Sequence, residues 1–172
     1  MFKKSISNIL RTYNKNLSRH VHTEANMKKL NIELPELVPP KGNYISYVKS
    51  GNMAYLSGHL PLKNGTLITG VVGEDLNLEQ AQEAARCAGL QLIGTMKLNL
   101  GDLDKVKRIV RVGGFVQCTN DFNDQALVTN GCSDLMHEVF GERGLHVRTS
   151  VGTNSLPLDI CVEIDCIIEV EE

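Results

Sequence analysis

Hydrophobic and polar residues follow two different periods along the chain, and the longer period predicts two helices. From residue 78 to residue 98, apolar side chains recur every three or four positions, at Ala81, Ala84, Ala85, Ala88, Leu92 and Met96. Polar residues, Gln91 among them, are expected to lie off this stripe. Asn77 is a candidate N-cap, and Gly101 follows the last turn as a stop signal. The small Ala side chains predict close packing against a sheet.

A second helical repeat covers residues 121–140 and ends at Gly141, with an apolar face of Val128, Cys132, Leu135, Met136 and Val139. Runs of β-forming residues predict strands over residues 44–48, 53–56, 66–68, 105–118, 147–151 and 158–169. Gly113 and Gly114 interrupt the longest run and mark a β-bulge or a place where another backbone or a ligand comes close. The order β-β-β-α-β-α-β-β predicts an α+β fold with both helices packed on one face of a sheet.

The N-terminal residues differ from the rest of the chain in charge. Residues 1–23 contain no acid, and their basic side chains are Lys3, Lys4, Arg11, Lys15 and Arg19. This composition is typical of a mitochondrial transit peptide, and the alternative is a basic tail on a cytoplasmic protein. Residues 24–42 include Pro39 and Pro40, so we expect an extended lead-in there. A single domain is then expected over residues 43–172.

Composition narrows the possible partners. The net charge is −2, and without the five positive charges of residues 1–23 the remainder carries −7. An acidic body with no stripe of Lys and Arg is a poor partner for a phosphate backbone, which argues against nucleic-acid binding. No apolar run approaches the roughly 20 residues that span a bilayer, so no membrane partner is expected. The five scattered cysteines form no C-x-x-C pair and no zinc-finger pattern, so we expect them to be apolar core residues.

Familiar catalytic and cofactor-binding motifs are absent from the sequence, which has no G-x-G-x-x-G, Walker loop, G-x-S-x-G or H-E-x-x-H. We therefore expect neither a cofactor nor a metal. Arg148 stands out because it lies in a β-like segment, where a charge is costly unless it is paired. It is either an ion-paired or solvent-reaching side chain at a strand end, or the anchor of a binding site.

The residues around Arg148 resemble the C-terminal signature of the RidA/YjgF family, also called the endoribonuclease L-PSP family. The family pattern is Arg-Ser-x-Val, then Leu-Pro, then Val-Glu-Ile/Val-Glu. Here it reads Arg148-Thr149-Ser150-Val151, Leu156-Pro157 and Val162-Glu163-Ile164-Asp165. Nearer the N-terminus, the family's Tyr, Gly-Asn and Ser-Gly-Gln-x-Pro are similar to Tyr44, Gly51-Asn52 and Ser57-Gly58-His59-Leu60-Pro61. Asn130 falls where the family carries an active-site Asn.

The resemblance implies a chorismate-mutase-like (YjgF/RidA-like) fold and a homotrimer with ligand sites between subunits. It further implies hydrolysis of enamine and imine intermediates, such as 2-aminoacrylate, 2-iminopropanoate and 2-iminobutanoate, to 2-oxo acids and ammonia. Arg148 would grip the substrate carboxylate with two parallel hydrogen bonds, and Glu163 would hold and deprotonate the attacking water. The remaining substrate-binding residues implied by the resemblance are Tyr44, Ser57, Gly58, Asn130 and Ser150.

Two departures from the family pattern leave alternatives open. Ser150 stands where many of the family's deaminases carry Cys, and His59 replaces the usual Gln. We expect His59 and His146 to be surface or pocket-rim groups and not bases. One alternative function is a non-catalytic trimer that binds small carboxylic acids in the Arg148 pocket. The other is the endoribonuclease activity for which family members are often named, against which the acidic charge argues.

Overall fold

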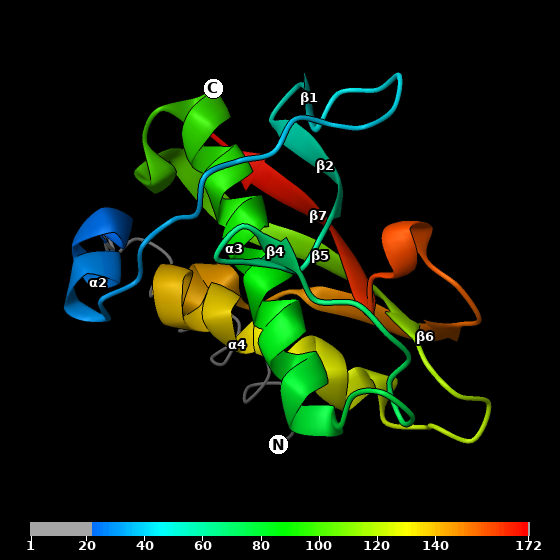
Figure 1. Ribbon diagram of the computed structural model, residues 1–172. Coiled ribbons are helices and arrows are strands. Elements are labelled where there is room, and N and C mark those ends of the chain that lie inside the picture. The colour runs from blue at the N-terminus through cyan, green and yellow to red at the C-terminus, as the bar shows by residue number, and fades with distance from the viewer. Residues whose placement is uncertain (1–21, 172) are drawn as a thin grey trace, which may run out of the picture.

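The computed structural model describes residues 22–171, so nearly all of the predicted transit peptide lies outside the described residues. Within this range, a mixed five-stranded sheet has the strand order β1-β2-β7-β5-β6 (Figure 1). Its strands are β1 (Tyr47–Ser50), β2 (Met53–His59), β5 (Val106–Gln117), β6 (Val147–Thr153) and β7 (Val162–Val170). A separate small sheet pairs β3 (Leu62–Lys63) with β4 (Thr66–Leu67).

The helices of the described range are α2 (Thr23–Lys29), α3 (Leu78–Leu100) and α4 (Gln125–Phe140). Short 3-10 turns lie at η1 (Leu103–Lys105), η2 (Gly141–Gly144) and η3 (Pro157–Asp159). Strands β5 and β6 are parallel, joined by α4, and the other neighbours in the main sheet are antiparallel. Helices α3 and α4 lie side by side on one face of the sheet (Figure 1). The predicted α+β fold with two helices on one face is thus confirmed.

Helix α3 begins and ends where the sequence predicts. Asn77 caps it by accepting a hydrogen bond from the Gln80 backbone, while the Gln80 side chain accepts one from the Asn77 backbone. Gly101 ends the helix with φ of 73°, a conformation that favours glycine. The Ala stripe is fully buried, as expected. The expectation for Gln91 is wrong, because its side chain is buried.

The glycines of α4 and β5 leave room for close neighbours. A Cβ at Gly131 would overlap the backbone of Gln82, so this glycine lets α3 and α4 touch. Helix α4 itself begins four residues later than predicted, at Gln125. In β5, the register shifts lie before residue 112, and a side chain at Gly114 would collide with Thr129 of α4. The groups that come close to the Gly113–Gly114 pair are the side chains of Asp165 and Thr129, so neither a bulge nor the approach of another backbone is observed there.

Residues 23–42 pack on the rest of the protein, and the sequence did not predict the helix among them. Met27 of α2 is 6% exposed and belongs to the hydrophobic core. The Asn26 side chain donates to the backbone carbonyl of Val139 in α4 at 3.1 Å. Farther along, Leu37 lies directly over Gly94 of α3. We propose that the folded unit starts at α2, earlier than the expected boundary at residue 43.

The two faces of the sheet differ in what covers them. On the side facing α3 and α4, the apolar residues of the central strands β2, β7 and β5 are buried, among them Ala54, Ile164 and Val112. On the other side, large apolar strand residues are exposed, namely Val48, Tyr55, Phe115, Val147 and Val151. The cysteines are all free thiols, and all but Cys118 are buried, as expected of core residues. Among the described residues, no helix combines the length and the apolar character needed to cross a membrane.

Candidate functional site

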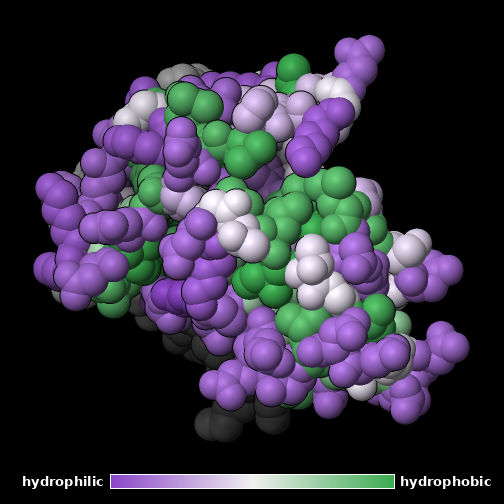
Figure 2. Space-filling view, viewed as in Figure 1, coloured by the Kyte–Doolittle hydropathy of each residue, from purple (hydrophilic) through white to green (hydrophobic). Residues whose placement is uncertain are grey.

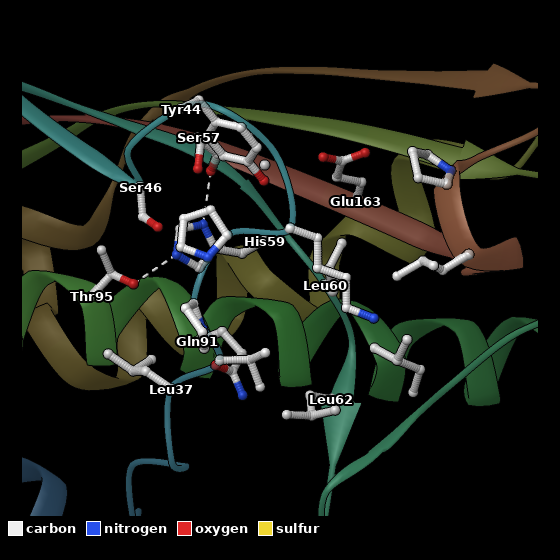
Figure 3. Close-up of a pocket in the computed structure, with 18 of the residues that line it drawn as sticks. Leu37, Tyr44, Ser46, Ser57, His59, Leu60, Leu62, Gln91, Thr95 and Glu163 are labelled. Carbon is white, nitrogen blue, oxygen red and sulfur yellow. Dashed lines mark hydrogen bonds between the residues drawn. The ribbon is translucent and has the colours of Figure 1, made fainter.

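A cavity of about 450 Å³ lies between α3, the end of β2 and the chain segment that precedes β1. Four residues selected from the sequence line it: Tyr44, Ser57, Gly58 and Glu163. Figure 3 shows Tyr44, Ser57 and Glu163 at one end of this cavity and Leu37, Leu62 and Gln91 at the other. The cavity therefore joins a polar end to a largely apolar one.

The position of Glu163 depends on an irregularity in β2. The β2–β7 register shifts between Leu56 and His59, which places Gly58 against the Glu163 side chain. A Cβ at position 58 would overlap the Glu163 carboxylate, so glycine leaves the space that this carboxylate occupies. Burial raises the pKa of Glu163, and the nearby Asp165 carboxylate raises it further. Glu163 thus has the raised pKa that suits a proton-transferring acid or base at neutral pH.

His59 is fixed by hydrogen bonds on both ring nitrogens. Its Nδ1 lies 2.7 Å from the Ser57 carbonyl oxygen and its Nε2 lies 2.7 Å from Thr95 Oγ1 (Figure 3). Because a carbonyl can only accept, Nδ1 carries the proton and Nε2 accepts from the Thr95 hydroxyl. Burial lowers the pKa of His59. His59 lines the cavity but is only 9% exposed, so it is a buried structural group more than a rim residue.

Arg148 lies in a second cluster, where β6 meets α4. Its Nη1 donates to Asn130 Oδ1 and to Ser133 Oγ, both at 2.9 Å, and its Nη2 donates to the Ala126 carbonyl at 3.0 Å. Within residues 22–171, no Asp or Glu forms an ion pair with it. These bonds use three of the five guanidinium N–H groups, which leaves two for a carboxylate. The half-buried cation is therefore oriented but not neutralised by the described chain.

Ser133 links Arg148 to His146. Ser133 Oγ lies 3.0 Å from His146 Nε2, and His146 Nδ1 donates to the Gly144 carbonyl at 2.6 Å. Burial lowers the pKa of His146, and a neutral ring here accepts the Ser133 proton. The Ser133 hydroxyl can then accept from Arg148 while it donates to His146. Each hydrogen bond in this series from Arg148 to Gly144 therefore has one donor and one acceptor. Sequence reasoning missed Ser133, which lies one helical turn after Asn130.

Ser150 turns toward α4. Its hydroxyl donates to the Gln125 carbonyl at 2.7 Å and lies 2.6 Å from Thr129 Oγ1. In the described chain, this hydroxyl joins β6 to the first turn of α4.

The candidate residues therefore form two groups within one chain. Tyr44, Ser57, Gly58 and Glu163 line the cavity, whereas Arg148, Asn130 and Ser150 do not. Strand β5 separates β6, which carries Arg148, from β7, which carries Glu163. Within residues 22–171, no group of three His, Cys, Asp or Glu side chains is arranged to hold a metal ion.

A family model described as "YjgF/chorismate mutase-like, putative endoribonuclease" matches residues 24–169. The chain belongs to this family. A crystal structure of the protein Atu1372 from Agrobacterium tumefaciens, whose function is unknown, shares 38% sequence identity with this chain and has a TM-score of 0.80. The match covers 93% of this chain and 99% of that one. The predicted family and its chorismate-mutase-like fold are confirmed.

Three relatives are similar to most of this chain. Protein TCP17 of Trypanosoma cruzi is 43% identical over 85% of this chain and 92% of its own length. A 2-iminobutanoate/2-iminopropanoate deaminase of Dermatophagoides farinae is 26% identical over 81% of this chain and 95% of its own length. The mitochondrial protein mmf2 of Schizosaccharomyces pombe is 28% identical over 73% and 86%, respectively. The relatives of this chain thus include a deaminase and a mitochondrial protein.

Proposed function

We propose that this protein hydrolyses 2-imino acids, and the enamines in equilibrium with them, to 2-oxo acids and ammonia. The observation that carries the proposal is Arg148, a guanidinium held in place by neutral groups and without a carboxylate partner in the described chain. An imino acid supplies the missing carboxylate, and its planar geometry suits a bidentate pair with Arg. The deaminase among the relatives supports the same reaction.

Glu163 supplies the proton chemistry in this proposal. Its carboxylate removes a proton from water, and the resulting hydroxide adds to the imine carbon to form a tetrahedral amino alcohol. Protonated Glu163 returns this first proton to the nitrogen as the amino alcohol forms. Its carboxylate then takes the hydroxyl proton and passes it to the same nitrogen, so the C–N bond breaks and ammonia leaves as the C=O bond forms. A carboxyl whose pKa is raised by burial is suited to both transfers, since it must accept and release a proton in each.

We further propose that one site combines residues from two subunits of a homotrimer. Arg148 and Asn130 do not line the cavity that holds Glu163 and Tyr44, so a second copy is needed to unite them. The exposed apolar residues on the uncovered face of the sheet, including Phe115 and Val151, favour burial against other copies. Light scattering at micromolar concentration should find a trimer, and a stable monomer would contradict this arrangement.

Mixing two inactive variants tests the shared site directly. Arg148→Ala lacks the anchor and Glu163→Gln lacks the base, so each homotrimer should be inactive. After the two are unfolded together and refolded at equal amounts, about three quarters of the trimers are mixed and each has one intact site of three. About a quarter of the wild-type activity should return. If no activity returns although both variants refold as trimers, Arg148 and Glu163 do not meet across subunits.

The reaction itself is tested by adding the protein to a threonine dehydratase that turns over serine or threonine, with semicarbazide present to trap free imine. The expected result is faster 2-oxo acid formation and less semicarbazone. Arg148→Lys and Glu163→Gln should lose this effect. Arg86→Lys and Glu138→Gln are matched controls, because this ion pair lies outside the cavity. Binding of 2-oxobutanoate by the wild type without hydrolysis would establish a non-catalytic binding protein instead.

We also propose that residues 1–23 direct the protein to mitochondria. The support is their basic, acid-free composition together with the mitochondrial relative in fission yeast. A fluorescent reporter that carries these residues should be imported. A reporter that stays in the cytosol, while a reporter with a known transit peptide is imported, would contradict the proposal.

A further inference from the structure

We propose that the apolar end of the cavity is a side-chain subsite that selects imino acids with an extended side chain, and that Gln91 recognises a hydrogen-bond acceptor near the tip of that side chain. This inference rests on the proposed function and names its substrate class. The relevant substrates have a chain of four or five atoms beyond the imine carbon, mostly apolar, with an ether or carbonyl oxygen toward the end.

The first argument is size. Cavities of roughly 300–1,000 Å³ hold drug-sized ligands, and this one measures about 450 Å³. A three- or four-carbon imino acid would fill only the polar end, near Ser57 and Glu163. The remaining space extends away from the reacting group to Leu37 and Leu62, as Figure 3 shows. A longer side chain would occupy it.

The second argument is the character of this space. It is walled by aliphatic side chains and proline rings, among them Leu37, Leu60, Leu62, Leu67, Pro157 and Leu158. Figure 2 shows hydrophobic residues gathered near the middle of the face that carries α3, within a hydrophilic surround. An apolar side chain that leaves water at such walls gains affinity with every buried CH₂ group.

Gln91 is the exception in this apolar region. Its side chain is 5% exposed, and its amide Nε2 is buried with no hydrogen-bond partner among the described residues. A buried donor without a partner is costly, and most buried polar groups in proteins are paired. The terminal torsion of Gln is broad, so the amide can turn toward a ligand in the cavity. An acceptor on the ligand would satisfy this group.

The neighbouring polar side chains are already occupied. His59 uses both ring nitrogens, and the Thr95 hydroxyl is its partner on α3. Thr95 lies one helical turn from Gln91 on the same wall. Of the two polar side chains that α3 contributes to this cavity, Gln91 is therefore the one that can discriminate between substrate side chains by hydrogen bonding.

Stable 2-oxo acids, the products of the proposed reaction, can test the subsite by calorimetry on the full-length protein. Pyruvate probes the polar end alone. 2-Oxoheptanoate adds an apolar chain, and 5-methoxy-2-oxopentanoate is its isostere with an ether oxygen in place of one CH₂. Each buried CH₂ raises affinity about fourfold, so 2-oxoheptanoate should bind at least about tenfold more tightly than pyruvate.

Two variants assign this preference to the cavity. Leu62→Trp fills the apolar end and should weaken 2-oxoheptanoate binding about tenfold while leaving pyruvate binding within about twofold. Gln91→Leu removes the donor at similar volume. It should reduce the affinity for the ether relative to 2-oxoheptanoate by about threefold to tenfold. Thermal unfolding and circular dichroism check that each variant is folded. If Leu62→Trp does not fold, the ether-to-alkyl affinity ratio of Gln91→Leu still tests the proposal.

The outcomes separate this inference from the proposed function. If the wild type binds none of the three acids, both fail. If it binds pyruvate as tightly as 2-oxoheptanoate, the subsite is absent and the proposed function stands. A preference for 2-oxoheptanoate over pyruvate that survives unchanged in a folded Leu62→Trp variant would place the side chain elsewhere and overturn the proposal. An ether-to-alkyl affinity ratio that is unchanged in Gln91→Leu would overturn the role of Gln91.

Discussion

Replacing Gly58 by Ala tests whether the observed position of Glu163 is the reactive one. The added Cβ would lie 2.6 Å from the carboxyl carbon of Glu163 and 2.8 Å from its Cγ, so the carboxylate must move. Gly58 is not among the glycines with positive φ, so its backbone accepts Ala without strain. The displaced group is the end of a flexible side chain. The free energy of unfolding should therefore stay within about 1 kcal/mol of the wild-type value.

The rate of imine hydrolysis should fall far more than the stability. A positioned general base typically contributes about 10²- to 10⁴-fold, which corresponds to about 2.7–5.4 kcal/mol in the activation free energy. Gly58→Ala should lose most of this factor in the dehydratase assay with semicarbazide. Its 2-oxo acid affinity should change less than its rate, because Arg148 still binds the carboxylate.

A double-mutant cycle identifies the cause of the loss. If Gly58→Ala acts by displacing Glu163, it should have little further effect in a Glu163→Gln background. A double variant that is much slower than Glu163→Gln would show that Gly58 acts on another group. A fully active Gly58→Ala protein would refute the reasoning, since the reaction would then proceed with the carboxylate away from its observed place.

Four further predictions follow from the remaining parts of the structure. Arg148→Ala should weaken 2-oxobutanoate binding by roughly 1.5–3 kcal/mol, and Arg148→Lys should also weaken it, as measured by calorimetry, because Lys lacks the bidentate geometry. The hydrolysis rate should rise with pH through the raised pKa of Glu163, since only the ionised carboxylate accepts a proton. Two results in the pH–rate profile would argue against this assignment. One is a rise in rate centred below the usual pKa of Glu, and the other is a rise whose midpoint does not change in Glu163→Asp. The lowered pKa of His59 means that the folded state binds a proton at this residue less readily than the unfolded state does. The free energy of unfolding should therefore keep its full His59 contribution above about pH 6.5 and decline as the pH falls toward the lower folded pKa. Urea denaturation should show a smaller decline in His59→Gln. Removal of residues 1–42 should lower the free energy of unfolding by about 3–5 kcal/mol relative to a chain that begins at residue 22, because the burial of Met27 and the Asn26 hydrogen bonds are lost. If urea denaturation finds the two chains equally stable, the domain starts at residue 43.

Much of the fold could be predicted because local signals agree with the tertiary structure. The Ala stripe of α3, its Asn77 cap and its Gly101 stop are all present in the sequence, and each has the expected structural role. Helix α2 could not be predicted in this way. It has only seven residues, too few to be stable alone, and it is held by the burial of Met27 against distant elements.

The candidate site was less predictable than the fold. Family motifs select Arg148 and Glu163, but the separation of these two residues by β5 depends on strand order, which no local pattern encodes. The burial of Gln91 follows from its spacing along the helix and not from its polarity. It lies seven residues after Ala84 and three after Ala88, and both positions belong to the buried stripe.

The place of β7 determines when the protein can fold during its synthesis. This strand is the last along the chain, yet it lies between β2 and β5 at the centre of the sheet. While it is still inside the ribosome, the emerged chain can form only the separate β1–β2 and β5–β6 pairs, each with an unpaired inner edge. Closure of the core must therefore wait until β7 has left the ribosome, and a nonsense mutation at Glu163, which removes nearly all of this strand, would leave two halves that cannot join.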